Sequence, residues 1–155
     1  KCSRTRDYAA VWNLKGWCLD DLGQINEAIA AYERTLQYDM SISRVWYNVG
    51  LLYMRIGRQQ DAFKAYTNAI MYDPKNAVAQ SNMGVYYVKM GEPEKALEYA
   101  LKAMELDVRI YQAMSTAALS YKMLGDEENA EKYCKMYGLH GGNAKQLRQR
   151  LKDVG

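Results

Sequence analysis

A chain of 155 residues is long enough for one compact domain or for a short array of repeats. Its hydrophobic fraction of 49% and charged fraction of 25% are typical of a folded protein and argue against disorder. A formal net charge of +3 is too small to indicate a nucleic-acid partner. No apolar run approaches the roughly 20 residues that a membrane span needs, so we expect no direct membrane insertion.

The chain begins at Lys1 without a methionine or a signal-peptide pattern, so we expect a fragment or a processed product. Its three cysteines, Cys2, Cys18 and Cys134, are far apart and form neither a C-x-x-C pair nor a disulfide framework. This usage favours a reducing compartment, with the cytoplasm as the expected one, and leaves the localisation otherwise open.

Residues of the same type recur every 34 positions along the chain. A glycine does so four times, and an alanine follows each glycine by five residues. The glycines are Gly23, Gly57, Gly91 and Gly125, and the alanines are Ala28, Ala62, Ala96 and Ala130. We therefore expect repeats at 9–42, 43–76, 77–110 and 111–142, with a degenerate end to the fourth. Residues 1–8 are expected to be a tail or the end of a preceding helix, and 143–155 a capping helix.

Each repeat is predicted to fold as two helices. In the second repeat, apolar residues at i, i+3, i+4 and i+7 predict a helix over about 44–56. Gly57 ends this helix, because glycine adopts a left-handed conformation readily. A second helix is predicted over about 60–72 and ends before Pro74, since proline disfavours a helical residue before it. Pro93 lies near the start of the equivalent helix in the third repeat, where its missing N–H does no harm.

A column of small residues predicts close helix packing in every repeat. Helices approach within roughly 8–10 Å when the contact residues are small, and large residues fill the space beside those contacts. The small residues are Gly16, Gly50, Gly84 and Ala118, and large ones in the second repeat are Trp46, Tyr53 and Tyr66. Because a pair of helices cannot bury its apolar face alone, successive pairs are expected to stack.

The pattern resembles the tetratricopeptide repeat family, whose repeats carry W-x-x-L-G-x-x-Y and then G, A, F/Y, A and P. The second repeat, WYNVGLLYMRIGRQQDAFKAYTNAIMYDP, matches every position conservatively. The resemblance covers about 9–137 and implies an all-α, right-handed superhelical α-solenoid of helix-turn-helix repeats with a C-terminal capping helix. The other repeats depart from the pattern at Lys15, Met40, Gln80, Ala100, Val108 and Tyr137.

The last element is a predicted helix over about 144–153, which Asn143 can cap. Leu147, Leu151 and Val154 lie at i, i+4 and i+7 and form an apolar stripe. Basic residues lie outside this stripe, so we expect a helix that covers the last repeat and exposes a solvated face.

The sequence contains no set of residues typical of catalysis, metal binding or cofactor binding. His140 is the single histidine and lies in a glycine-rich segment, without a second histidine to form a metal site. Cys18 and Cys134 occupy apolar helical positions, so we expect them in the core rather than as nucleophiles. We therefore predict no catalytic residue, no metal and no cofactor, and a protein that is not an enzyme.

In the tetratricopeptide family, the first helices of the repeats line a concave groove that binds peptides. The corresponding positions here are apolar for a surface, which is typical of a binding site. The resemblance thus implies a peptide-binding groove formed by Asn13, Trp17, Arg44, Tyr47, Asn48, Leu51, Met54, Arg55, Asn82, Val85, Lys89, Leu119 and Lys122. The same positions also include Ala10, Leu14, Val88 and Met123.

Two amides recur at one groove position, Asn48 and Asn82, which are 34 residues apart. An amide can donate and accept hydrogen bonds at once, so this pair is suited to the backbone of an extended peptide. The equivalent positions in the other repeats are Leu14 and Thr116, so the series of amides is short.

Three cations, Arg55, Lys89 and Lys122, lie near the ends of successive first helices. They either attract an acidic ligand or favour the helix C-termini. A subset of the family clamps the C-terminal carboxylate of chaperones with lysines, asparagines and an arginine. The matching positions here are Asn13, Trp17, Asn48, Val78 and Asn82, and Asn48 alone fits. We therefore predict no such clamp.

The sequence supports two functions. The first is a non-catalytic protein-interaction scaffold that binds a peptide or protein segment of unknown identity in the groove. The alternative is a structural array that self-associates into an oligomer or filament without a dedicated peptide ligand.

Overall fold

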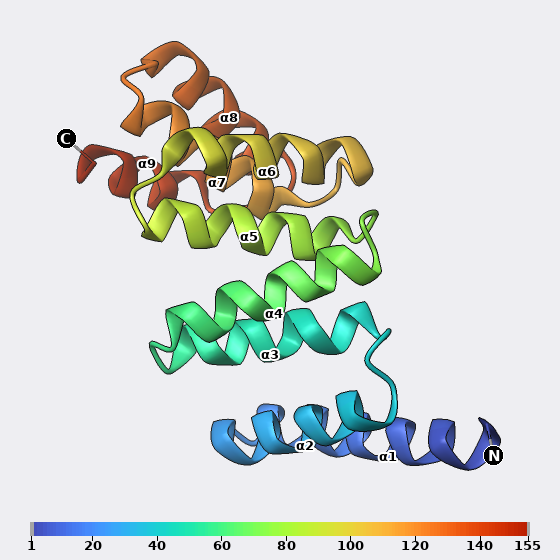
Figure 1. The fold of residues 1–155 in the computed structure, drawn as a ribbon. Helices are drawn as coiled ribbons and strands as arrows, with labels where there is room; N and C mark the ends of the chain where they lie inside the picture. Colours follow the sequence, from blue (N-terminus) through green and yellow to red (C-terminus); the bar gives the residue numbers. More distant parts are fainter. Residues whose placement is uncertain (1, 155) are drawn as a thin grey trace. The chain divides into compact units, whose positions relative to one another are not determined.

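The computed structural model describes the backbone of residues 2–154 and the side chains of residues 4–154. The regular secondary structure of this range is entirely helical, which confirms the all-α fold (Figure 1). The helices are α1 (Cys2–Asp21), α2 (Ile25–Tyr38), α3 (Ser43–Arg55), α4 (Gln59–Tyr72), α5 (Ala77–Lys89), α6 (Pro93–Leu106), α7 (Tyr111–Met123), α8 (Glu127–Leu139) and α9 (Ala144–Lys152).

The chain divides into two compact units, Lys1–Pro74 and Lys75–Gly155, and each is described by itself. The first contains α1–α4 and the second α5–α9. Within each repeat the two helices lie side by side, joined by a tight turn (Figure 1). The right-handed superhelical path of the repeats stays a prediction.

The turns inside the repeats depend on the predicted glycine column. All four glycines have φ between +74° and +80°, a left-handed conformation that other residues rarely adopt. At the end of α3, the Gly57 N–H donates to the Met54 carbonyl at 3.3 Å, and the Arg58 N–H donates to the Tyr53 carbonyl at 2.8 Å. This is the Schellman pattern, in which a left-handed residue lets the chain satisfy the last helical carbonyls.

In the first unit, glycines in the first helices make room for tyrosine rings from the second helices. A Cβ atom at Gly16 would lie 2.7 Å from the Tyr32 ring, and one at Gly50 would lie 2.5 Å from the Tyr66 ring. Both tyrosines are buried. The small column predicted from the sequence therefore accommodates a large aromatic side chain rather than bringing two small residues together.

The second unit has small residues at the places of these tyrosines, namely Ala100 and Cys134. Without a ring to fill the space, α5 and α7 pack directly against each other. A Cβ atom at Gly84 would lie 3.2 Å from the Thr116 Cγ2 atom, so the side chain of α7 reaches the backbone of α5. The repeat position that holds a tyrosine in the first unit and a small residue in the second therefore accounts for the direct packing of α5 against α7.

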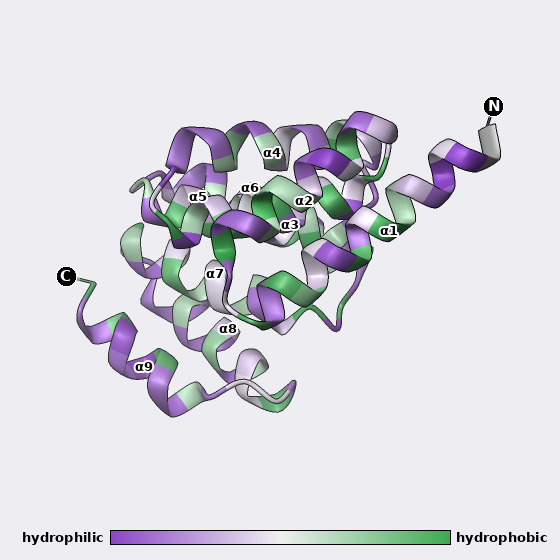
Figure 2. Ribbon diagram, turned by 90° about the horizontal axis from the view of Figure 1, so that it is seen from below, coloured by the Kyte–Doolittle hydropathy of each residue, from purple (hydrophilic) through white to green (hydrophobic). Residues whose placement is uncertain are grey.

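The C-terminal helix α9 covers the last repeat as predicted. Asn143 caps it, because its side chain accepts a hydrogen bond from the Gln146 N–H at 2.9 Å. Figure 2 shows α9 as mainly hydrophilic, with hydrophobic positions interleaved. Leu147 and Leu151 are those that are buried, and they join a core with Ala118, Leu119 and Cys134.

Tyr137 replaces the small residue of the repeat pattern at the point where the chain turns toward α9. A Cβ atom at Gly142 would lie 2.3 Å from the Tyr137 ring, so the loop that leads to α9 passes directly over this side chain. Tyr137 also packs against the core that contains Leu147 and Leu151. The fourth repeat is degenerate at its end because it packs there against this loop and the capping helix.

The prediction for residues 1–8 is wrong for the part that the structure describes. Residues 2–8 form neither a tail nor a separate preceding helix, because they continue into α1 without interruption. The Tyr8 ring stacks on Tyr38 with 5.6 Å between the ring centroids, which ties this extension to the end of α2. Lys1 and Gly155 lie outside the described residues.

Cys18 is exposed, so its predicted place in the core is wrong, whereas Cys134 is buried as predicted. The residue equivalent to Cys18 in the second repeat is Leu52, which is buried. In the second repeat, α2 packs against α3, whereas no described helix precedes α1. The repeat pattern alone therefore does not determine whether this position is buried.

Candidate functional site

Residues predicted for the groove line a cleft between α1 and α3 in the first unit. The cleft has a volume of about 470 Å³, within the range of ligand pockets in proteins, roughly 300–1,000 Å³. Five predicted site residues meet there, two from α1 and three from α3. The described lining consists of Ala10, Asn13, Leu14, Trp17, Tyr32, Arg44, Tyr47 and Asn48.

Tyr32 of α2 lies between the two walls of the cleft. Its ring occupies the space beside Gly16 of α1, and it lines the cleft together with Asn48 of α3. Burial, followed by the negative charge of Asp20, raises the pKa of Tyr32 to about 12. The phenol is neutral at physiological pH, as an unperturbed tyrosine also is.

The walls combine apolar surface with free hydrogen-bonding groups. Leu14 and Trp17 are 60% and 56% exposed, although both are large apolar side chains. Tyr47 and Asn13 are half-buried. The Asn13 side chain makes no hydrogen bond to another described residue, so its amide can serve a ligand.

The other predicted residues of α3 lie outside the described lining of this cleft. Leu51 is exposed and Met54 is half-buried. Arg55 forms an ion pair with Asp20 of α1 at 2.6 Å, so it links the C-terminal ends of the two helices. Lys122, in the second unit, pairs with Glu127. For these two cations, the structure provides partners within the protein.

The predicted groove residues of the second unit differ in exposure. Lys89 is exposed and Val85 is half-buried. Asn82 is 3% exposed, because residues 79–84 of α5 are buried in succession. Its amide nitrogen has no hydrogen-bond partner among the described residues.

Leu119 is 6% exposed, because Leu147 and Leu151 of α9 pack in the same core. A cleft of about 410 Å³ lies beside this contact and is lined by Val88, Leu119, Met123, Arg150, Asp153 and Val154. The capping helix thus shares this part of the surface with predicted groove positions.

The sequence reasoning missed Tyr32, because it considered residues of the first helices alone. The signal was available: a tyrosine recurs as Tyr32 and Tyr66, each 16 residues after a glycine of the small column. Glycines facing a recurrent aromatic residue indicate that a ring inserts there. Such a ring can reach the surface formed by the neighbouring first helix.

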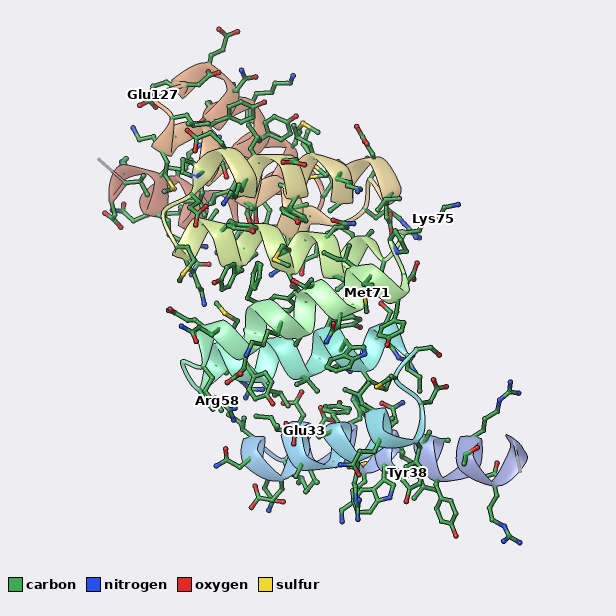
Figure 3. All side chains as sticks on the ribbon, viewed as in Figure 1. Glu33, Tyr38, Arg58, Met71, Lys75 and Glu127 are labelled. Carbon is green, nitrogen blue, oxygen red and sulfur yellow. The ribbon has the colours of Figure 1, made fainter. Side chains whose placement is uncertain are left out.

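Among the described residues, no group of three or more histidine, cysteine, aspartate or glutamate side chains is arranged to hold a metal ion. In the same range, none of the helices has both the length and the apolar character needed to cross a membrane. Neither observation assigns a function, and the cleft between α1 and α3 is the candidate site because five predicted groove residues line it. Figure 3 shows the side chains along both units, with Glu33, Tyr38 and Arg58 labelled in the first.

Two family models described as tetratricopeptide repeat match the chain. One matches residues 9–41 and 43–76, and the other matches residues 77–107. The chain belongs to the tetratricopeptide repeat family. This confirms the resemblance seen in the sequence, and the family's fold is consistent with a protein-interaction scaffold. A search of curated protein sequences found no match.

Solved tetratricopeptide structures share this fold. A crystal structure of MamA is 26% identical, with a TM-score of 0.77, and the match covers 85% of this chain and 77% of MamA. A tetratricopeptide repeat protein from Parabacteroides merdae ATCC 43184 is 19% identical, with a TM-score of 0.81, over 94% of this chain and 58% of that one. The first tetratricopeptide repeat domain of Spaghetti (RPAP3), solved bound to the HSP90 peptide SRMEEVD, is 20% identical, with a TM-score of 0.73. The match covers 77% of this chain and 94% of that one.

Proposed function

We propose that this tetratricopeptide chain is a non-catalytic interaction module that binds a peptide or protein segment in the cleft between α1 and α3. The observation that carries the proposal is the meeting of five predicted groove residues in one cleft. They come from two consecutive repeats, and the resemblance to the family implied all of them.

The chemistry of the cleft suits a peptide. Exposed apolar side chains such as Leu14 and Trp17 provide area that a ligand can remove from water. Asn13 and Asn48 stand on opposite walls and can bond to the N–H and C=O groups of an extended backbone. The Spaghetti domain, which shares the fold, is bound to a peptide in its solved structure.

Trp17→Ala should weaken peptide binding at least tenfold, because exposed aromatic residues in a cleft dominate such interfaces. Peptides would be selected against the protein from a random dodecapeptide display library. Their dissociation constants would then be measured by fluorescence anisotropy. Trp17 is more than half exposed, so its removal should leave the helical content unchanged, which circular dichroism checks.

Met71→Ala is the matched control, since Met71 is an equally exposed apolar residue on α4, outside the cleft. We expect it to bind the selected peptides with unchanged affinity. Equal affinities for the Trp17→Ala variant and the unaltered protein would rule out the cleft as the binding site.

A second candidate function, self-association, is favoured by one face of α1. Val11 is 62% exposed, whereas the equivalent residues Val45 and Ala113 are 0% exposed. Helix α2 packs against α3 and α6 against α7, which buries the equivalent positions. If α1 binds a second copy, light scattering over a concentration series should show a dimer that Val11→Lys abolishes. A constant monomer mass would eliminate this alternative.

A further inference from the structure

Arg44 is the one charged side chain among the described residues that line the cleft. It is exposed, and its guanidinium forms no ion pair with another described residue. This distinguishes it from Arg55 on the same helix, which is neutralised by Asp20. The cleft therefore has a positive charge that the described part of the protein leaves uncompensated.

The place of Arg44 in its helix adds to this charge. It lies in the first turn of α3, near the positive end of the helix dipole, and no acidic residue accompanies it there. A cation at this end is unfavourable by a few tenths of a kcal/mol or more. A cation in an unfavourable position that has no ion-pair partner among the described residues is typical of a functional site, where a ligand supplies the partner.

The other described residues that line the cleft carry no charge to oppose it. Tyr32, which lines the cleft with Arg44, is a neutral phenol at physiological pH, and burial raises its pKa further above that range. Asp20 is the carboxylate that acts on Tyr32, and Arg55 is paired with it. Asp21 follows Asp20 at the C-terminal end of α1, whereas Arg44 lies at the N-terminal end of α3.

We propose that the cleft selects an acidic peptide, in which an aspartate or glutamate carboxylate pairs with Arg44 and a neighbouring apolar side chain packs on Leu14 and Trp17. This inference rests on the proposed function and specifies its ligand. The two requirements are coupled, because the cation and the apolar surface belong to the same cleft. Arginine is well suited to the acidic group, since its planar guanidinium can bond to both carboxylate oxygens.

The test uses three pools of fluorescein-labelled decapeptides with random residues at the other positions. One pool fixes Glu-x-Leu at its centre, a second fixes Lys-x-Leu and a third fixes Glu-x-Ser. Anisotropy is measured at about 0.15 M salt, where charges separated by more than roughly 8 Å are largely screened. We expect the Glu-x-Leu pool to bind at least fivefold more tightly than either of the others. Equal binding of the Glu-x-Leu and Lys-x-Leu pools would refute the proposal.

Arg44→Glu should weaken binding of the Glu-x-Leu pool at least tenfold and favour the Lys-x-Leu pool, because it reverses the charge at the cleft. Lys64→Glu is the matched control: it makes the same change in net charge at an exposed position of α4, outside the cleft. If both variants lost the same affinity for the Glu-x-Leu pool, the effect would be one of net charge alone, and the inference would be overturned.

Trp17→Ala separates this inference from the proposed function. If Trp17→Ala weakens the binding of every pool and Arg44→Glu weakens none, the cleft binds peptides without a preference for acidic ones, and the inference alone is refuted. If neither variant affects any pool, the proposed site itself is wrong.

Discussion

Leu147→Ala should lower the free energy of unfolding by about 3 kcal/mol, the middle of the range for a buried leucine. Leu147 is 2% exposed and lies in the core that joins α9 to the fourth repeat. Its truncation leaves a cavity beside Cys134 and Leu119, which helices anchored on both sides cannot readily close. Urea denaturation followed by circular dichroism at 222 nm measures the change.

Leu139→Ala is the control, because the same atoms are removed from a side chain that is 84% exposed. It should change the free energy of unfolding by less than about 0.5 kcal/mol. If both variants lost the same stability, α9 would not be packed in solution as described. Leu119 would then be open to solvent.

Gly50→Ala should also destabilise the protein, by about 2 kcal/mol, although alanine is the better helix former. Replacing glycine by alanine inside a helix normally gains about 1 kcal/mol. Here the added Cβ atom would lie 2.5 Å from the Tyr66 ring, which is buried and has little room to move. Overpacking of this kind costs roughly 1–3 kcal/mol or more, and we expect it to outweigh the gain in helix propensity.

The fourth repeat suggests the control. At the positions equivalent to Gly50 and Tyr66 it has Ala118 and Cys134, so an alanine there is combined with a small residue in place of the tyrosine. In a Tyr66→Cys background, Gly50→Ala should therefore be neutral or stabilising. A double-mutant cycle of the two substitutions, measured by urea denaturation, isolates this coupling. Additive losses in the cycle would show that the clash with the Tyr66 ring is not the cause.

The cleft shows how far the resemblance to the family reaches. The resemblance implied that Asn13, Trp17, Arg44, Tyr47 and Asn48 share one surface, and all five line one cleft in the structure. This succeeds because residues on one face of a helix recur at fixed spacings, and the repeat copies that face into the next helix. Whether they bind a peptide stays a prediction.

The position of a residue in the repeat does not determine its burial where the environment of the repeat differs from that of its neighbours. Leu119 occupies a groove position, and the packing of α9 beside it leaves it 6% exposed. Cys18 occupies a core position, but it is exposed on α1. A repeat pattern predicts on which face of its helix a residue lies. Whether that face is buried depends on the neighbouring element.

The sequence by itself determined the family, the helical composition, the glycine turns and the cap at Asn143. The turns and the cap depend on residues within one or two helical turns of each other, and the family is recognised from residues that recur every 34 positions. The tertiary structure decided which parts of the predicted groove are open. Tyr32 lies between α1 and α3, where the cleft is found, whereas α5 and α7 pack directly where Ala100 replaces that tyrosine. Side-chain volumes on separate helices decide this difference, and they act together once the helices have packed.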